Sequence, residues 1–267
     1  MHSDHSPLPH ALAMVFVPLL LLGCNDSQQK PVANEPVAAE VVKPETPVVA
    51  PQAPLNREGL IRAALSAATA AALGQEDIDG QAQLKGRRFE LRMRFGCAAT
   101  EVQAANAAKA GSGWTYDEAK GVLRTRVQAD LDAERLRESA LIGEEYEGAV
   151  GFTIPHPWML SAGCPDPKFA MQGPAISVVQ LFTESDSRVQ RPQPSHETVT
   201  PLKPQEVPAQ GLSLVISGRL KALPDGRAIH CSAAAGQPAC IISTLIDRVA
   251  IEDPARNGVV LGEWGAS

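Results

Sequence analysis

The chain has 267 residues, a formal net charge of −6 and a sequence pI near 5.6. Hydrophobic residues make up 44% of it, which supplies enough apolar surface for a buried core in one or two domains. The acidic balance and the aromatic content of only 4% argue against a dedicated nucleic-acid binder, which needs Lys and Arg for phosphates and rings for stacking.

The N-terminus combines a short apolar run with a cysteine. Residues 11–22 are apolar, which is too short for a membrane-spanning helix but suits the core of a cleavable signal peptide. Leu21-Leu22-Gly23-Cys24 follows and resembles the lipobox of bacterial lipoproteins, in which the thiol accepts a diacylglycerol after a small residue. The resemblance covers residues 1–24. It implies a signal peptide at 1–23 and a lipid anchor on Cys24 that holds the chain in the cell envelope.

The residues after Cys24 indicate which membrane would hold the protein and how far its folded part could extend from that membrane. In the lipoprotein class an acidic residue directly after the Cys retains the protein at the inner membrane, and here Asn25 takes that place with Asp26 behind it. This favours the periplasmic side of the outer membrane. Residues 24–55 form a linker rich in Pro, Ala and Val, whose six prolines prevent helix and strand pairing. Fully extended, it would reach roughly 95 Å. It is either a passive spacer or a Pro-rich ligand for a partner's groove.

Residues 56–267 carry the remaining net charge of −3, which implies no steering of a charged partner. They open with a helical pattern. Asn56 is a favourable N-cap, apolar residues recur at helical spacing from Leu60 to Leu73, and Gly74 can end the helix.

A period of two follows the helix. Residues 88–97 alternate strictly between polar and apolar, as do residues 123–131, and both patterns predict half-buried strands. Trp114-Thr115-Tyr116 and a turn around Lys120-Gly121 complete a hairpin with the second. We expect further strands at 148–154, 176–182, 212–222, 240–251 and 259–264, with turns at Pro224-Asp225-Gly226 and Asn257-Gly258.

These elements predict a mainly β fold: an antiparallel β-sandwich or small barrel with one N-terminal helix, cross-linked by two disulfides. A Pro-rich stretch between Arg191 and Gly211 is either a long surface loop or a join between subdomains 56–190 and 211–267.

Four cysteines remain after Cys24, and an even number in an exported chain predicts disulfides. Cys231 and Cys240 can meet across a hairpin-like loop, which pairs Cys97 with Cys164 by elimination. The absence of a CxxC spacing disfavours a structural zinc site and a thioredoxin-like redox role. We therefore predict no metal site and no cofactor.

The common catalytic motifs are lacking or incomplete in this sequence. The sequence lacks GxSxG, GxxxxGK and a helix-opening GxGxxG, and His196-Glu197 is followed by Thr200 where HExxH requires a second His. The acidic segment 75–80 differs from an EF-hand loop because Gly86 stands where the bidentate Glu belongs. A Ser/His/Asp site assembled in space from His156, His196 or His230 stays open. We expect Trp158 to fill the core beside the Cys97 disulfide, with a binding loop as the alternative, and His230 to be structural.

The polar faces of two predicted strands are basic. If these strands are neighbours in one sheet, a single face would carry five guanidinium groups, which would indicate an anionic ligand such as phosphorylated lipid or glycan. The alternative is a solvated face with cross-strand Arg–Glu and Arg–Asp pairs. The five residues are Arg88, Arg92, Arg94, Arg124 and Arg126.

Three functional hypotheses result. The first is a non-enzymatic envelope lipoprotein that binds or assembles with an envelope partner and reaches the membrane through its lipid. The second is a periplasmic hydrolase with a His-dependent site. The third is a module that binds anionic lipid or glycan through the arginine face.

Overall fold

The computed structural model describes residues 52–75, 78–97, 111–166, 173–188, 194–233 and 238–265. The chain divides into two units, Met1–Val49 and Ala50–Ser267, and all of these residues belong to the second. The predicted signal peptide, Cys24 and most of the linker lie outside the described residues. Within the described part of the chain, no helix is long and apolar enough to cross a membrane.

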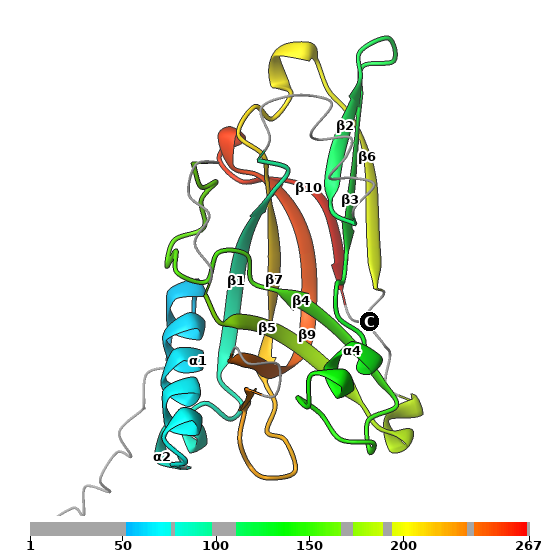
Figure 1. Ribbon diagram of the computed structural model, residues 1–267. Helices are drawn as coiled ribbons and strands as arrows, with labels where there is room; N and C mark the ends of the chain where they lie inside the picture. Colours follow the sequence, from blue (N-terminus) through cyan, green and yellow to red (C-terminus); the bar gives the residue numbers. More distant parts are fainter. Residues whose placement is uncertain are drawn as a thin grey trace, which may run out of the picture. The chain divides into compact units, whose positions relative to one another are not determined.

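The predicted N-terminal helix is α1, Arg57–Ala72 (Figure 1). The Asn56 side chain accepts a hydrogen bond from the Gly59 backbone N–H at 3.0 Å, which satisfies one of the free donors of the first turn. One face of α1 packs against β1, β8 and β9. Its buried residues on that face are Leu60, Ile61, Ala64 and Ala67.

A seven-stranded sheet forms most of the unit. Five strands follow the order β1-β7-β9-β5-β4, and β8 and β10 pair with the long central strand β9. Their bounds are β1 Arg88–Phe95, β4 Gly148–Thr153, β5 Ala175–Phe182, β7 Leu212–Leu220, β8 Ile229–Ser232, β9 Ala239–Asp253 and β10 Val259–Gly265.

The mainly β architecture is confirmed, but the sheet is mixed rather than wholly antiparallel. β5 runs parallel to the first half of β9, where Ile176 lies opposite Cys240, while every other pairing in the sheet is antiparallel. Residues 88–182 contribute β1, β4 and β5, and residues 212–265 contribute the remaining strands. Because β7 and β9 lie between β1 and β5, segments 56–190 and 211–267 share one sheet and are not separate subdomains.

A second sheet contains the predicted hairpin. It has the order β2-β3-β6, with β2 at Gly113–Asp117, β3 at Val122–Gln128 and β6 at Ser195–Pro201. β6 lies in the Pro-rich stretch that the sequence assigned to a loop or a join, so that assignment was wrong for these seven residues. The β6 sequence SHETVTP pairs antiparallel with β3 and has only one proline, at its end, so its ladder hydrogen bonds survive.

Short helices connect these strands. The α-helical turns are α2 at Ile78–Ala82 and α4 at Ala133–Glu138, and the 3₁₀ turns are η1 at Glu184–Arg188, η2 at Pro204–Glu206 and η3 at Pro254–Arg256.

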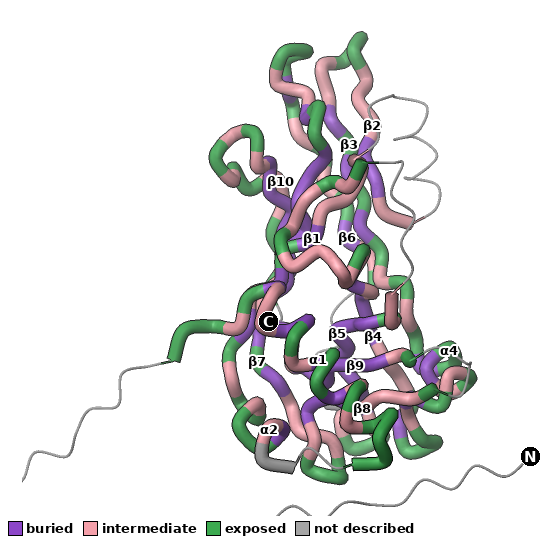
Figure 2. The backbone as a smooth tube through the Cα atoms, turned by 60° about the vertical axis from the view of Figure 1, so that its left-hand side comes forward, coloured by how far each residue is buried: buried purple, intermediate pink, exposed green. Residues whose placement is uncertain are grey.

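The core covers both faces of the large sheet around β5, β7 and β9. Figure 2 shows buried residues along β5, β7 and β9. On one face, Phe89, Ile216 and Ile242 belong to the main core beneath α1. On the other, Val179, Leu181 and Ile241 pack with Leu136 of α4 in a smaller cluster. The strands in the middle are therefore buried on both sides, which accounts for their nearly continuous apolar sequences.

Candidate binding cleft and charged surfaces

Both predicted disulfides are present. Cys231 and Cys240 are cross-strand partners on β8 and β9, and their Cα atoms lie 4.1 Å apart. Their sulfurs lie 4.0 and 3.7 Å from the carbonyl oxygen of Ala64, so this bridge packs beneath α1. Cys97 and Cys164, with Cα atoms 5.5 Å apart, join the end of β1 to the loop 155–164.

The loop 155–164 is held at its other end by Arg57. The buried Arg57 guanidinium donates to the backbone carbonyls of Met159 at 3.0 Å, Pro155 at 2.5 Å and His156 at 3.1 Å. Burial lowers the pKa of Arg57 from its ordinary value. An arginine of the first helical turn and a disulfide thus fix both ends of one loop.

Trp158 does not fill the core as the sequence predicted. Its side chain is half-buried in the loop, edge-on to the His156 ring with centroids 5.6 Å apart. The tryptophan of the core is Trp114 on β2, which is 6% exposed and donates from Nε1 to the Gly96 carbonyl at 3.2 Å. The PHPW segment forms a turn, in which the Met159 backbone N–H donates to the His156 carbonyl at 2.8 Å, and its residues are exposed or half-buried, which leaves the indole outside the packed layer.

A cleft of about 760 Å³ lies between the two sheets. Its floor is apolar and comes from Met93 of β1, Leu214 of β7, Val127 of β3 and Phe152 of β4. Its volume falls in the range of small-ligand sites, which are about 300–1,000 Å³.

The segment between β3 and α4 forms one wall of this cleft because it pairs with both sheets. Ala129 donates its backbone N–H to the carbonyl of Pro194, and Asp130 donates to the carbonyl of Gly151 on β4. The Asp130 carboxylate accepts from the Thr153 backbone N–H at 2.9 Å, while Arg135 donates to the Asp130 carbonyl at 2.7 Å. Polar groups at this edge are therefore held in place around an apolar floor.

The five predicted arginines do not share one face. β1 and β3 belong to different sheets, so Arg88, Arg92 and Arg94 are separated from Arg124 and Arg126. The condition on which the anion-binding prediction rested is therefore wrong, because alternation within a strand does not specify its neighbours.

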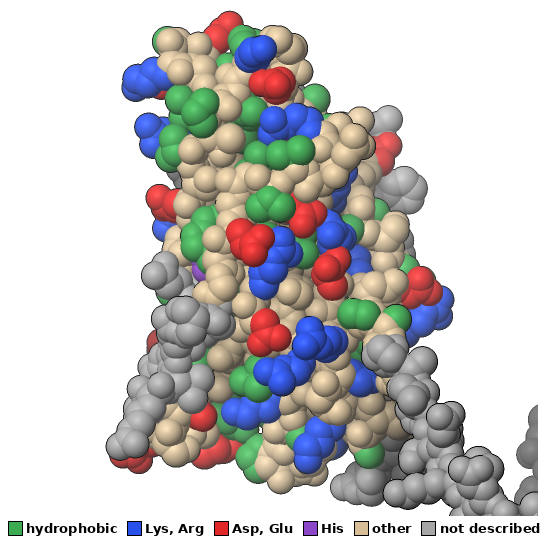
Figure 3. Space-filling view, turned by 180° about the vertical axis from the view of Figure 1, so that it is seen from behind, with side chains coloured by type: hydrophobic (Ala, Val, Ile, Leu, Met, Phe, Trp, Pro, Cys, Tyr) green, Lys and Arg blue, Asp and Glu red, His purple; other side chains and the backbone are tan. Residues whose placement is uncertain are grey.

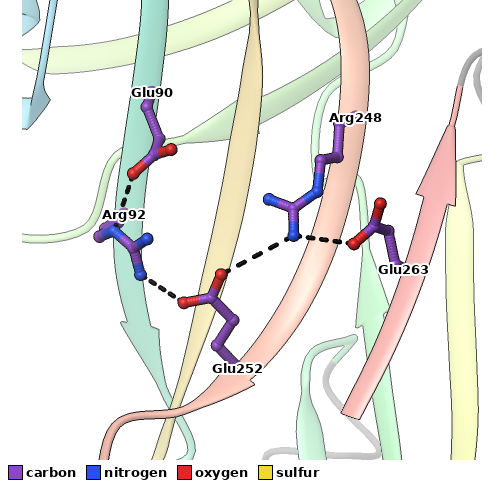
Figure 4. A network of polar contacts seen from close by, with 5 residues as sticks. All are labelled: Glu90, Arg92, Arg248, Glu252 and Glu263. Carbon is purple, nitrogen blue, oxygen red and sulfur yellow. Dashed lines mark hydrogen bonds and ion pairs between the residues drawn. The ribbon is translucent and has the colours of Figure 1, made fainter. Parts of the chain in front are cut away.

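One face of the large sheet carries a network of alternating charges from β1, β9 and β10, shown in Figure 4. Arg92 is hydrogen-bonded to Glu252 and, at 3.0 Å, to Glu90; Arg248 lies 2.9 Å from Glu263 and 3.8 Å from Glu252. The hydrogen bond from Arg248 holds the pKa of Glu263 below its ordinary value, and the hydrogen bond to Glu252 raises the pKa of Arg92. These pairs match the alternative of a solvated face with compensated charges.

Three of the other four arginines have local contacts. Arg94 donates to the Gly211 carbonyl at 3.4 Å, and burial lowers its pKa. Arg126 faces Glu197 across the β3–β6 pair at 3.4 Å. The pKa of Asp117 is lowered first by the hydrogen bond from Lys120, with a smaller contribution from Arg124.

The three histidines occupy unrelated places. His156 is exposed with φ of +50°, and His196 is buried with its ring 4.8 Å from that of Trp264. His230 lines a cavity of about 370 Å³ with Asp225 and Tyr146, and its imidazole is hydrogen-bonded to the Ala140 carbonyl. Burial is the main cause that lowers the pKa of His230, and the nearby Arg227 adds to it. Asp225 is engaged by Arg227 at 2.6 Å.

Among the residues that the structure describes, no group of three or more His, Cys, Asp or Glu side chains could hold a metal ion. The segment 75–80 lies only partly within these residues. Comparison with known proteins returned no matching family model, no matching curated protein and no matching solved structure.

Proposed function

We propose that this protein is a cell-envelope lipoprotein that acts as a non-enzymatic binding or assembly module, anchored through Cys24 on the periplasmic side of the outer membrane. The lipobox-like Leu21-Leu22-Gly23-Cys24 and the Pro-rich linker support the anchor. The disulfides Cys97–Cys164 and Cys231–Cys240 suit an oxidising compartment such as the periplasm.

The cleft between the sheets is the observation that carries the binding role. A ligand group that packs on the apolar floor formed by Met93, Val127 and Phe152 would remove apolar surface from water, which favours binding. Asp130 and Arg135 at the edge of the cleft could orient the ligand through hydrogen bonds. This combination fits an amphipathic ligand or a partner segment with one apolar side chain inserted and a polar backbone at the edge.

The binding role is tested by photo-cross-linking in cells. A photoreactive residue is placed at Arg135, which lines the cleft, or at Glu138, which is also exposed on α4 but does not line it. We expect a discrete adduct from position 135 that is absent from position 138, identified by mass spectrometry. Identical products from both positions, or none from position 135, would contradict a binding role for the cleft.

The anchor is tested separately. The variant Cys24→Ser should lose labelling by a fatty-acid analogue and leave the membrane fraction, because the thiol is the predicted acceptor of the lipid. Unchanged membrane retention would exclude the lipoprotein assignment without affecting the cleft.

A further inference from the structure

One end of the large sheet carries five cations, here named the basic end: Lys85, Arg87, Arg88, Arg219 and Lys221. Arg88 at the start of β1 is the direct cross-strand partner of Arg219 on β7. The pairing continues beyond both strands, because Gly86 donates to the Leu220 carbonyl and Leu220 donates to the Arg87 carbonyl. Two paired segments, residues 85–88 and 219–221, therefore bring these cations together. Only Arg88 was among the arginines that the alternating pattern predicted. The other four cations lie outside the two strands on which that prediction was based.

The basic end is poorly compensated compared with the rest of the same face. Figure 3 shows acidic and basic side chains interleaved in the middle of this face and Lys and Arg gathered below them. Arg219 lies 3.9 Å from the half-exposed Asp247, and Arg87 donates to the Ala53 carbonyl at 3.2 Å. Within the described ranges, no side-chain hydrogen bond or ion pair is formed by Lys85, Arg88 or Lys221.

Like charges opposite each other on adjacent strands destabilise a sheet. The Arg88–Arg219 pair therefore has a cost in the isolated protein that an external anion would relieve. Exposed Lys and Arg heads in one surface favour a partner that presents many phosphates rather than one buried anion.

The chain leaves the folded unit toward Cys24 at this same end. Gln52 lines a shallow pocket of about 330 Å³ together with Lys85, Arg87 and Arg88. Three residues later, Leu55 pairs with Phe89 at the start of β1, which fixes the exit point of the linker. A surface beside the attachment point of a tether meets the anchoring membrane at high effective concentration, so weak individual contacts suffice.

We propose that the basic end docks the folded unit onto the phosphate head groups of the membrane that holds the lipid anchor. This proposal rests on the proposed function because the lipid anchor brings the basic end close to a membrane. The attraction between its Lys and Arg side chains and lipid phosphates does not depend on the anchor. Each Lys or Arg near an anionic bilayer strengthens binding about fivefold, so a cluster of this size holds the unit at the surface at moderate salt.

Lysine footprinting on the full-length acylated chain tests the docking. The protein is reconstituted in vesicles of phosphatidylcholine, or of phosphatidylcholine and phosphatidylglycerol in equal parts, and the acetylation rate of each lysine is measured by mass spectrometry. We expect Lys85 and Lys221 to be protected severalfold only in the anionic vesicles. Lys120 in the β2–β3 turn and Lys203 just after β6 should react equally in both.

Two charge-matched variants identify the surface. Arg88→Glu with Arg219→Glu should weaken docking by about 25-fold or more and abolish the protection of Lys85 and Lys221. Arg124→Glu with Arg126→Glu makes the same change of charge on β3 and should leave that protection intact. Protection lost equally in both variants, or never seen in anionic vesicles, would overturn the proposal.

The same footprint with Cys24→Ser separates docking from anchoring. If Cys24 carries no lipid, the proposed function fails on its own terms. Docking is then still decided by adding anionic vesicles to the Cys24→Ser chain, where protection of Lys85 and Lys221 at higher lipid concentration supports it and its absence excludes it. Added salt should remove the protection, whereas inorganic phosphate should have no effect beyond that of its ionic strength, because the contacts are spread over a surface.

Discussion

Arg57 shows how one residue can connect the N-terminal helix to a distant loop. Its guanidinium is buried in the first turn of α1 and donates to three backbone carbonyls of loop 155–164. Because the guanidinium itself is buried and makes three charge-assisted hydrogen bonds, this position is worth more than a surface arginine. The helix pattern predicted α1 but gave no indication of the contacts of this side chain.

We predict that Arg57→Ala lowers the free energy of unfolding by about 3 kcal/mol, because three hydrogen bonds from a charged donor are lost. Arg57→Lys should recover only part of this, since one ammonium group cannot reach the carbonyls of both Pro155 and Met159. Urea denaturation measures the change. Arg62→Ala, which removes an exposed pair with Glu58, should cost less than about 1 kcal/mol; equal losses at both positions would contradict the role of Arg57.

His230 makes stability depend on pH. Burial and Arg227 lower its pKa below the ordinary value of 6.5, so between the two values the unfolded chain binds more protons than the folded one. Its contribution to stability is therefore present above pH 6.5 and is lost as the pH falls through the pKa of the folded state. Denaturation midpoints measured from pH 7.5 down to pH 5 should decline less in His230→Gln than in the wild type. A His230→Gln profile parallel to the wild type would refute the prediction.

At the scale of single elements, the β7–β9 pair contains an irregularity that depends on glycine. The register shifts between Ser217 and Gly218, and a Cβ atom on Gly218 would lie only 2.0 Å from the carbonyl oxygen of Leu245. On the other side of β9, the buried Gln180 accepts from the Ile246 backbone N–H at 2.9 Å, which satisfies a donor near the shift. The central strand therefore bends with its backbone groups still paired.

We predict that Gly218→Ala destabilises the protein by about 2 kcal/mol or more, because backbone rather than a flexible side chain must move. The matched control is Gly173→Ala, whose added methyl group would make ordinary contacts with Pro157 and Trp158 and should change stability little. Thermal denaturation followed by circular dichroism compares the two. A Gly218→Ala variant as stable as the control would show that the strands adjust freely.

The two disulfides differ in access. Cys164 is exposed, whereas Cys240 is 1% exposed and lies with Cys231 beneath Ala64 of α1. Since thiol–disulfide exchange requires the attacking thiolate to reach a sulfur, mild reduction of the folded protein should open Cys97–Cys164 first. Alkylation followed by peptide mapping should label Cys97 and Cys164 before the other pair. Simultaneous labelling of all four would indicate that reduction follows global unfolding.

Loop length adds a second difference between the bridges. The separation is 67 residues for Cys97–Cys164 and 9 for Cys231–Cys240. In the chain-entropy model these separations correspond to roughly 4 and 3 kcal/mol of stabilisation. The more accessible bridge is thus also the one that restricts the unfolded chain more.

At the scale of the whole molecule, one core joins parts of the chain that the sequence separates. α1, the first helix, covers strands from the last quarter of the sequence, and β7 and β9 are inserted between β1 and β5. The cleft exists because β3 leaves this arrangement to pair with β2 and β6, while the segment after it returns to β4. The binding function proposed for the cleft therefore depends on the order of strands and not on any local motif.

The sequence by itself determined the local elements and the covalent links of the folded unit. Helical spacing with an Asn cap gave α1, alternation gave β1 and the β2–β3 hairpin, and an even number of cysteines led to both bridges. These features depend on a few neighbouring residues, so their physics is contained in a short window. The missed strand β6 is polar, and it forms because the neighbouring strand β3 offers a partner.

The tertiary structure alone decided which surfaces exist. The five arginines found by alternation divide between two sheets, and Arg92 is compensated by Glu252, a residue 160 positions away. The basic end instead gathers Arg88 with Arg219 and Lys221, whose proximity follows from the β1–β7 register. Hydrophobic burial fixes which face of a strand points inward, but the neighbour of that strand depends on long-range pairing that no local pattern encodes.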